Sequence, residues 1–210
     1  MIDAPNQWRL ETPGHAGWQR TARPSDPHKY FMVSCDSHTN EPADLWRERL
    51  DAKYRDRLPK IVVDEQGVKW QVSEGWQKSR LHDSVFTGED LERQKSGADP
   101  VQRLKDMERD GVNAEIIFPN KGLLMWATPE PEFAQAQCRA YNDWAWETFG
   151  KYNDRMSPMA AIATGDLEGS IAEIQRVAKM GYRGLTLPCK PIFGSYDAKH
   201  PNYNLPLFDP

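Results

Sequence analysis

The stretch RAYNDWAWETFGKYNDRMSPMAAI, residues 139–162, changes its pattern part-way along. Its first half continues a run that begins near residue 130, in which apolar side chains recur at the three- and four-residue spacing of a helix. Its second half opens MSPMAAIAT (156–164), an apolar run of the length of a strand. A helix that leads into a buried strand is a repeating unit of α/β folds.

The same alternation extends toward the N-terminus. AEIIFPN (114–120) is typical of a buried strand, and the helix before it is expected to begin after Asp99 and to end at Gly111. The first strand signal is YFMVSCDSH (30–38), a mostly apolar run that we expect to be buried on both faces.

The alternation also extends toward the C-terminus. An amphipathic pattern predicts a helix over 166–180, ended by Gly181, and YRGLTLPC (182–189) is the fourth predicted strand. No further helix is expected after it. Strands that alternate with helices through short connections predict a parallel sheet with right-handed crossovers. The fold class is therefore α/β.

The composition excludes several classes of partner. The 210 residues carry a net charge of −4 and no polybasic run, so neither nucleic acid nor a membrane is expected as a partner. No apolar stretch approaches the roughly 20 residues of a membrane span. The three cysteines include no CxxC pair, which indicates a reducing, cytoplasmic location. Cys35 and Cys189 lie in predicted strands, where we expect them to be buried and unreactive.

Two segments fall outside the alternation. Residues 1–29 are polar and interrupted by prolines and glycines, so they are expected to form an extended N-terminal arm. Residues of about 47–98 are charged and irregular, and we expect them to be an insertion between the first strand and its helix. Within the insertion, residues 60–72 predict a β-hairpin that turns around Gly67.

Four segments are informative together: CDSHTNEPADLW (35–46), GVNAEIIFPNKG (111–122), the stretch 139–162 and MGYRGLTLPC (180–189). In order and spacing they resemble the amidohydrolase-2 family of metal-dependent hydrolases, which includes enzymes like aminocarboxymuconate-semialdehyde decarboxylase. The resemblance covers residues 30–210. It implies a distorted (β/α)₈ barrel of the TIM type, with a divalent metal (zinc, manganese or iron) at the carboxyl ends of the strands.

The resemblance implies two metal ligands. The first strand of the family ends in a pair of ligands separated by one residue, and the matching residues are Asp36 and His38. Residues two apart on a strand point to the same side, so both side chains can reach one ion. A carboxylate and an imidazole suit zinc, manganese or iron.

The chain holds only part of such a barrel. A TIM barrel has eight strands, and four are predicted here. The family's further ligands, a histidine after the fifth strand and an aspartate after the eighth, have no counterpart. We therefore expect the N-terminal half of a barrel, completed by a second chain or by self-association. A non-catalytic interaction subunit or a truncated product is the alternative.

Two further residues are candidates for acid–base chemistry. Glu41 lies three residues after His38, where the family often has a glutamate; a carboxylate that only holds a loop or helix start is the other interpretation. His82, in the insertion, has a side chain suited to proton transfer near neutral pH, although such a histidine can simply hold a loop. Asn120 and Lys190 follow the second and fourth strands, where a barrel carries its catalytic rim.

The resemblance implies one of two reactions on a small carboxylate or cyclic substrate. In hydrolysis, the metal activates a bound water and polarises a carbonyl group. In non-oxidative decarboxylation, it holds the substrate's carboxylate. Decarboxylases of the family often carry glutamate or histidine where Asp36 stands, which favours hydrolysis.

Overall fold

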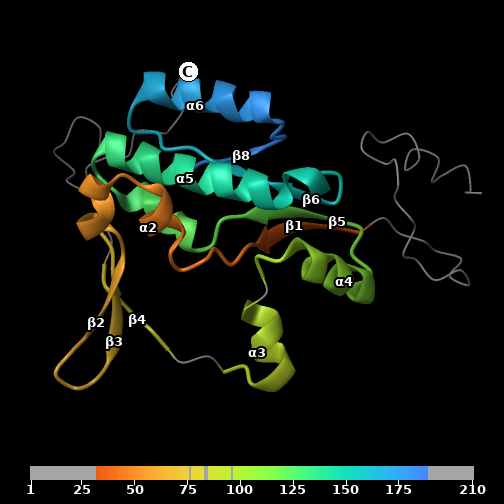
Figure 1. The fold of residues 1–210 in the computed structure, drawn as a ribbon, viewed down its shortest axis with the longest axis horizontal. Coiled ribbons are helices and arrows are strands. Elements are labelled where there is room, and N and C mark those ends of the chain that lie inside the picture. The colour runs from red at the N-terminus through yellow and green to blue at the C-terminus, as the bar shows by residue number, and fades with distance from the viewer. Residues whose placement is uncertain (1–31, 76, 83–84, 96, 189–210) are drawn as a thin grey trace, which may run out of the picture.

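A computed structural model describes residues 32–188, apart from 76, 83, 84 and 96 (Figure 1). The predicted arm at 1–29 and everything from 189 onward, Cys189 and Lys190 included, lie outside the described residues. The elements are β1 (Val33–His38), α2 (Leu45–Arg49), η2 (Ala52–Arg57), β2 (Lys60–Val63), β3 (Lys69–Val72), β4 (Ser79–Arg80), α3 (Gly88–Lys95), α4 (Pro100–Asp110), β5 (Ala114–Phe118), η3 (Lys121–Ala127), α5 (Pro131–Phe149), η4 (Gly150–Tyr152), β6 (Met156–Pro158), β7 (Ala160–Ala161), α6 (Leu167–Met180) and β8 (Leu185–Thr186).

The strands between the helices are parallel and follow one another in chain order. β1 pairs with β5, β5 with β6, and β7 with β8. β6 and β7 are separated only by Met159, whose amide donates to the carbonyl of Ile117 in β5. One segment thus pairs with β5 through its first part and with β8 through its last, and it corresponds to the strand predicted at 156–164. The predicted α/β class with a parallel sheet is confirmed.

Helix ends follow the capping residues that the sequence provides. The side chain of Asp99 accepts hydrogen bonds from the amides of Val101 and Gln102 at the start of α4, and Asp166 accepts one from Gly169 in α6. Both helices end at glycines in the left-handed region, Gly111 at φ 75° and Gly181 at φ 113°, where a side chain would be strained. None of the helices in the described part of the chain combines the length and apolar character that a bilayer crossing requires.

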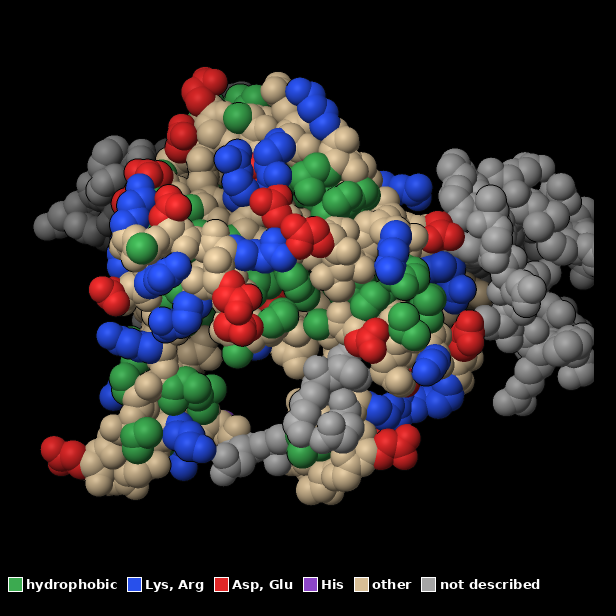
Figure 2. Space-filling view, viewed as in Figure 1, with side chains coloured by type: hydrophobic (Ala, Val, Ile, Leu, Met, Phe, Trp, Pro, Cys, Tyr) green, Lys and Arg blue, Asp and Glu red, His purple; other side chains and the backbone are tan. Residues whose placement is uncertain are grey.

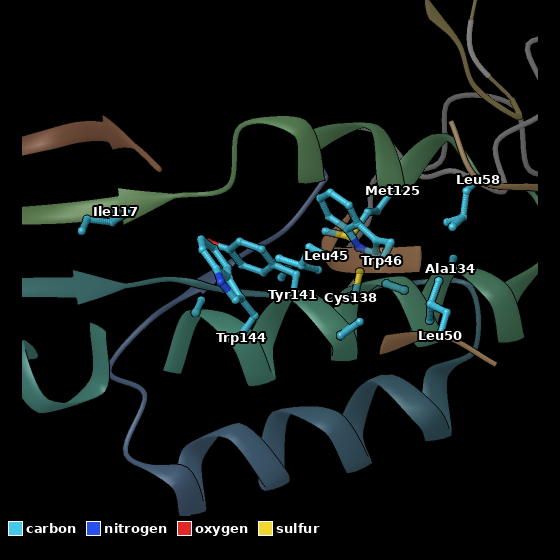
Figure 3. Packing of buried hydrophobic residues seen from close by; sticks show 14 of the residues in the cluster. Leu45, Trp46, Leu50, Leu58, Ile117, Met125, Ala134, Cys138, Tyr141 and Trp144 are labelled. Atoms are coloured by element: carbon cyan, nitrogen blue, oxygen red, sulfur yellow. The ribbon is translucent and has the colours of Figure 1, made fainter. Parts of the chain in front are cut away.

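The main core is built around α5, which packs against the strands, α2 and η3 (Figure 3). The YNDW segment of α5, residues 141–144, contributes to this core. Tyr141 and Asn142 are fully buried. The Asn142 amide accepts a hydrogen bond from the backbone N–H of Ala161 at 2.7 Å and donates to its carbonyl at 3.0 Å, so α5 is bonded to β7. Asp143 pairs with Arg176 at 2.6 Å and joins α5 to α6. The segment is scaffolding.

The insertion contains a three-stranded antiparallel sheet. β2 pairs with β3 in the register Lys60 to Val72, and β3 pairs with β4. The hairpin projects from the end of the molecule that carries α2 (Figure 1). An open gap separates it from α3 (Figure 2). Apolar side chains of β2 are exposed, with Ile61 at 64% and Val63 at 63%.

Two expectations about the strands were wrong. β1, predicted to be buried on both faces, exposes 41% of Val33, and Cys35 is exposed as well. The physical reason is its position, since among the described strands β1 pairs with β5 alone and forms the edge of its sheet. The fourth strand is also shorter than predicted, because only Leu185 and Thr186 pair with β7.

Candidate metal centre

Asp36 and His38 meet at the carboxyl end of β1. The Nε2 atom of His38 lies 3.3 Å from Oδ1 of Asp36, with 38% of the His38 side chain and 89% of the Asp36 side chain exposed. The pairing of β1 with β5 shifts between Ser34 and Ser37, which marks a bulge or irregularity beside the two residues. At this distance the two side chains are close enough to share one ion.

The second ring nitrogen of His38, Nδ1, forms a hydrogen bond that fixes the orientation of the imidazole. Nδ1 lies 2.7 Å from the carbonyl oxygen of Pro119, in the segment that follows β5. A carbonyl oxygen only accepts, so the hydrogen bond places the proton of a neutral imidazole on Nδ1 and leaves the Nε2 lone pair on the side of Asp36. Histidines that bind metals in proteins commonly make such a bond with their second nitrogen.

The backbone of His38 is held by the arginine of a mostly buried ion pair. Arg103 in α4 donates to the carbonyl oxygen of His38 at 3.0 Å and to that of Gly97 at 3.1 Å. The same guanidinium donates to Oε2 of Glu115 at 2.7 Å, and each side chain of the pair is 14% exposed. These three bonds join the end of β1 to α4 and to β5.

Glu41 occupies a structural position beside the pair. Its side chain is buried, and its carboxylate accepts hydrogen bonds from the backbone amides of Asn120, Lys121 and Gly122 at 2.9, 2.9 and 3.1 Å. The Nζ atom of Lys121 donates to the Glu41 backbone carbonyl. The carboxylate therefore satisfies the amides at the start of η3, an arrangement that matches the loop-holding interpretation. Its hydrogen bonds within the described residues include none to Asp36 or His38.

His82 and Asn120 lie in different surroundings. His82 is exposed and follows β4 in the insertion, with no hydrogen bond to Asp36 or His38 among the described contacts. Asn120 lines a polar cavity of about 370 Å³ together with His38 and Arg103. Of the sequence candidates, the structure brings together Asp36, His38 and Asn120 at one end of the sheet.

The donors present fit part of a metal site. Asp36 offers a carboxylate and His38 an imidazole with a fixed second nitrogen, both accessible from solvent. Among the described residues, no group of three or more histidine, cysteine, aspartate or glutamate side chains could hold an ion. The described residues thus offer two donors here, fewer than the three or four protein ligands of a typical zinc site.

Two buried side chains that could in principle act as nucleophiles, the Cys138 thiol and the Tyr141 hydroxyl, are core groups instead. Burial raises the pKa of the Cys138 thiol, and the pKa of the Tyr141 hydroxyl is raised well above its ordinary value by burial and by the charge of Glu41. Both groups stay protonated at neutral pH and act as core side chains.

Sequence reasoning missed the groups that support His38. The carbonyl of Pro119 has no side-chain signature, and Arg103 sits on an ordinary amphipathic helix 65 residues away. The one available signal was the position of Pro119 directly after the second strand, at the edge where parallel strands end.

Comparisons with known proteins identify the family of this chain. A family model described as amidohydrolase matches residues 26–209. A search of curated proteins found no match. Among solved structures, an amidohydrolase from Mycobacterium avium subsp. paratuberculosis is similar with a TM-score of 0.61 and 16% identity, over 78% of this chain and 51% of that one.

A second similar structure contains a metal. It is 5-carboxyvanillate decarboxylase from Novosphingobium aromaticivorans, with bound manganese and 3-methoxy-4-hydroxy-5-nitrobenzoic acid. Its TM-score is 0.51 at 18% identity, over 80% of this chain and 44% of that one. The chain thus spans about half the length of the solved structures that it matches.

Proposed function

The chain belongs to the amidohydrolase family, and from this premise we propose that it supplies the metal-binding N-terminal half of a (β/α)₈-barrel enzyme. The observation that carries the proposal is the joint position of Asp36 and His38, 3.3 Å apart at the carboxyl end of β1. Barrel enzymes carry their chemistry at that end of the strands.

Asp36 and His38 would hold one divalent ion as two of its ligands. Their exposure fits a site completed by groups from outside the described residues. The bound ion would supply a water of lowered pKa and a polarised carbonyl. Manganese in a structure of similar fold supports a divalent ion of that kind. Pro119 and Arg103 act as positioning residues, since one orients the ring of His38 and the other fixes its backbone.

Hydrolysis of a small carboxylate or cyclic substrate is the first candidate reaction. Decarboxylation is the second, because the similar structure that holds manganese is that of a decarboxylase. Glu41 would position the segment after β5 in either reaction, since its carboxylate is engaged by three backbone amides. His82 stays a candidate for proton transfer only if the insertion brings it to the bound substrate.

The remaining strands of the barrel would come from further polypeptide. Four features support this proposal: parallel strands in chain order, outer helices, an open edge at β1, and coverage of about half of each similar structure. Met32 and Val33 expose 54% and 41% of their surfaces at that edge. The unpaired backbone groups of an exposed edge strand promote pairing with another chain, which would also bury these two apolar side chains.

One experiment tests the proposed function as a whole. The tagged chain is purified from its source cells, and the metal content is measured for the isolated chain and for any complex. The proposal expects about one ion for each chain in the complex and a loss of that ion in the Asp36→Ala variant. A metal-free complex of the unaltered chain would instead support the non-catalytic interaction subunit.

The two reactions are separated by their products. The metal-loaded complex is given hydroxybenzoate-type acids and, separately, amides, esters and lactones. Release of carbon dioxide indicates a decarboxylase, and a new acid without carbon dioxide indicates a hydrolase.

A further inference from the structure

A pocket of about 370 Å³ lies where the hairpin meets α2, η3 and α5. This volume falls within the range of roughly 300–1,000 Å³ typical of small-molecule sites. Neither Asp36 nor His38 lines it. The pocket is thus separate from the candidate metal centre, and the proposed function does not use it.

The inner wall of the pocket is apolar. Trp46, Leu58 and Met125 line it, and each is at most 9% exposed. The indole Nε1 of Trp46 donates to the backbone carbonyl of Gln137 at 3.1 Å, so the single donor of this ring is already used. The hairpin contributes the side chain of Ile61, which is 64% exposed. An occupant with an apolar body would bury this surface.

The rim of the pocket is cationic. Arg47, Lys60 and Lys121 line it, whereas none of the described lining residues is an aspartate or a glutamate. Within the described part of the chain, none of the three forms a salt bridge, and the Nζ atom of Lys121 donates to a neutral group, the backbone carbonyl of Glu41. Elsewhere basic side chains lie beside acidic ones, as over α5 and α6 in Figure 2 and in the pair of Arg176 with Glu173.

We propose that this pocket binds a small organic carboxylate with an apolar body. The three cations offer charge-assisted hydrogen bonds to the carboxylate, and the buried wall receives the rest of the molecule. A neutral analogue of the same shape would keep the apolar contacts and lose the ionic ones. Binding needs no metal ion, so its failure and the failure of the metal proposal are distinguishable.

The experiment measures affinity by calorimetry on the full chain, at low ionic strength and with a chelator present. The probes are 2-naphthoate and octanoate, each compared with its amide. We expect at least one of the two carboxylates to bind about tenfold or more tightly than its amide, and the better of them identifies a flat or an extended body. Equal affinities of both acids and their amides, or no binding at all, would overturn the proposal.

Variants locate the bound carboxylate. Arg47→Gln with Lys60→Gln is expected to weaken carboxylate binding about tenfold and to leave amide binding unchanged. Arg55→Gln with Lys105→Gln removes the same charge from exposed positions outside the pocket and should change neither. Circular dichroism checks that each variant folds. An unchanged carboxylate affinity in the first double variant would contradict the assignment.

A second measurement is independent of these substitutions. In a spectrum of ¹³C-methyl methionine, the Met125 signal, assigned with a Met125→Leu variant, should shift as 2-naphthoate is added. A saturating probe that leaves this signal unmoved, or binding that disappears in Asp36→Ala, would place the carboxylate elsewhere and overturn the proposal.

Discussion

Arg103 donates to the backbone carbonyl of His38 across 3.0 Å, although 65 residues separate the two in sequence. Its guanidinium is neutralised by Glu115 at 2.7 Å, in a pair whose side chains are each 14% exposed. The position of the His38 backbone at the end of β1 therefore depends on a side chain of α4 and, through it, on Glu115 in β5.

We predict that Arg103→Met destabilises the chain by about 2–4 kcal/mol, because it leaves Glu115 as an unpaired, mostly buried charge and removes the donor to His38. Urea unfolding measures the loss. Arg103→Met combined with Glu115→Leu should recover part of it. Arg109→Met, which removes an exposed arginine paired with Asp110 on the same helix, is the control and should cost far less. Equal losses in Arg103→Met and the control would contradict this prediction.

Glu41→Gln separates a structural role from a catalytic one. Oε1 accepts from the amides of Asn120 and Gly122, and Oε2 accepts from that of Lys121. A glutamine must turn an N–H₂ group toward one of these donors, so we expect a loss of about 1.5–3 kcal/mol. The urea midpoint measures it. A variant of unchanged stability that has lost the activity of the assembled enzyme would show that Glu41 acts in catalysis instead.

The pH dependence of stability tests the contribution of Glu173, whose carboxylate in α6 accepts a hydrogen bond from Asn142 in α5. Burial alone would raise the pKa of Glu173, but hydrogen bonds from Arg176 and Asn142 lower it below its ordinary value of 4.5. A carboxylate whose pKa is lower in the folded state contributes stability that is fully present above its unfolded pKa and is lost as the pH falls through the folded one. Glu173→Gln should therefore reduce stability at neutral pH and flatten its decline below about pH 4.5. Parallel profiles for both proteins would refute the assignment.

Much of the fold could be predicted from the sequence, because its signals are local. Asp99 and Gly111 mark both ends of α4 through their own backbone chemistry. The exposure of β1 could not be predicted, since Val33 is apolar and its burial depends on whether a strand pairs on the other side of β1, which a local pattern does not report. The same limit applies to Glu41: three amides 79 to 81 residues away decide its role.

The candidate metal pair could be recognised in the sequence only as a pattern. The spacing of Asp36 and His38 showed that the two could share a side of a strand, and the structure adds their distance of 3.3 Å. The orientation of the imidazole depends on the backbone carbonyl of Pro119, after β5. Every residue has such a carbonyl, so the sequence pattern could not predict this contact.

The open edge of β1 predicts association in solution. Light scattering during gel filtration should give a mass above the 24.1 kDa of one chain, or a complex with a second polypeptide. Met32→Lys with Val33→Lys places charges on the exposed edge and should shift self-associated material toward the monomer. Val85→Lys with Phe86→Lys is the control, since these exposed apolar residues lie in the insertion. A stable monomer with cooperative unfolding would contradict the half-barrel proposal.

Titration with Mn²⁺, followed by the line broadening of side-chain NMR signals, tests the central proposal most directly. We expect substoichiometric Mn²⁺ to broaden the signals of Asp36 and His38 first, and Asp36→Ala and His38→Ala each to weaken Mn²⁺ binding. His82→Ala, which removes an exposed histidine from the insertion, should leave binding unchanged. Binding of undiminished strength in the Asp36→Ala and His38→Ala variants, or broadening centred on other residues, would contradict the assignment of these two residues as metal ligands.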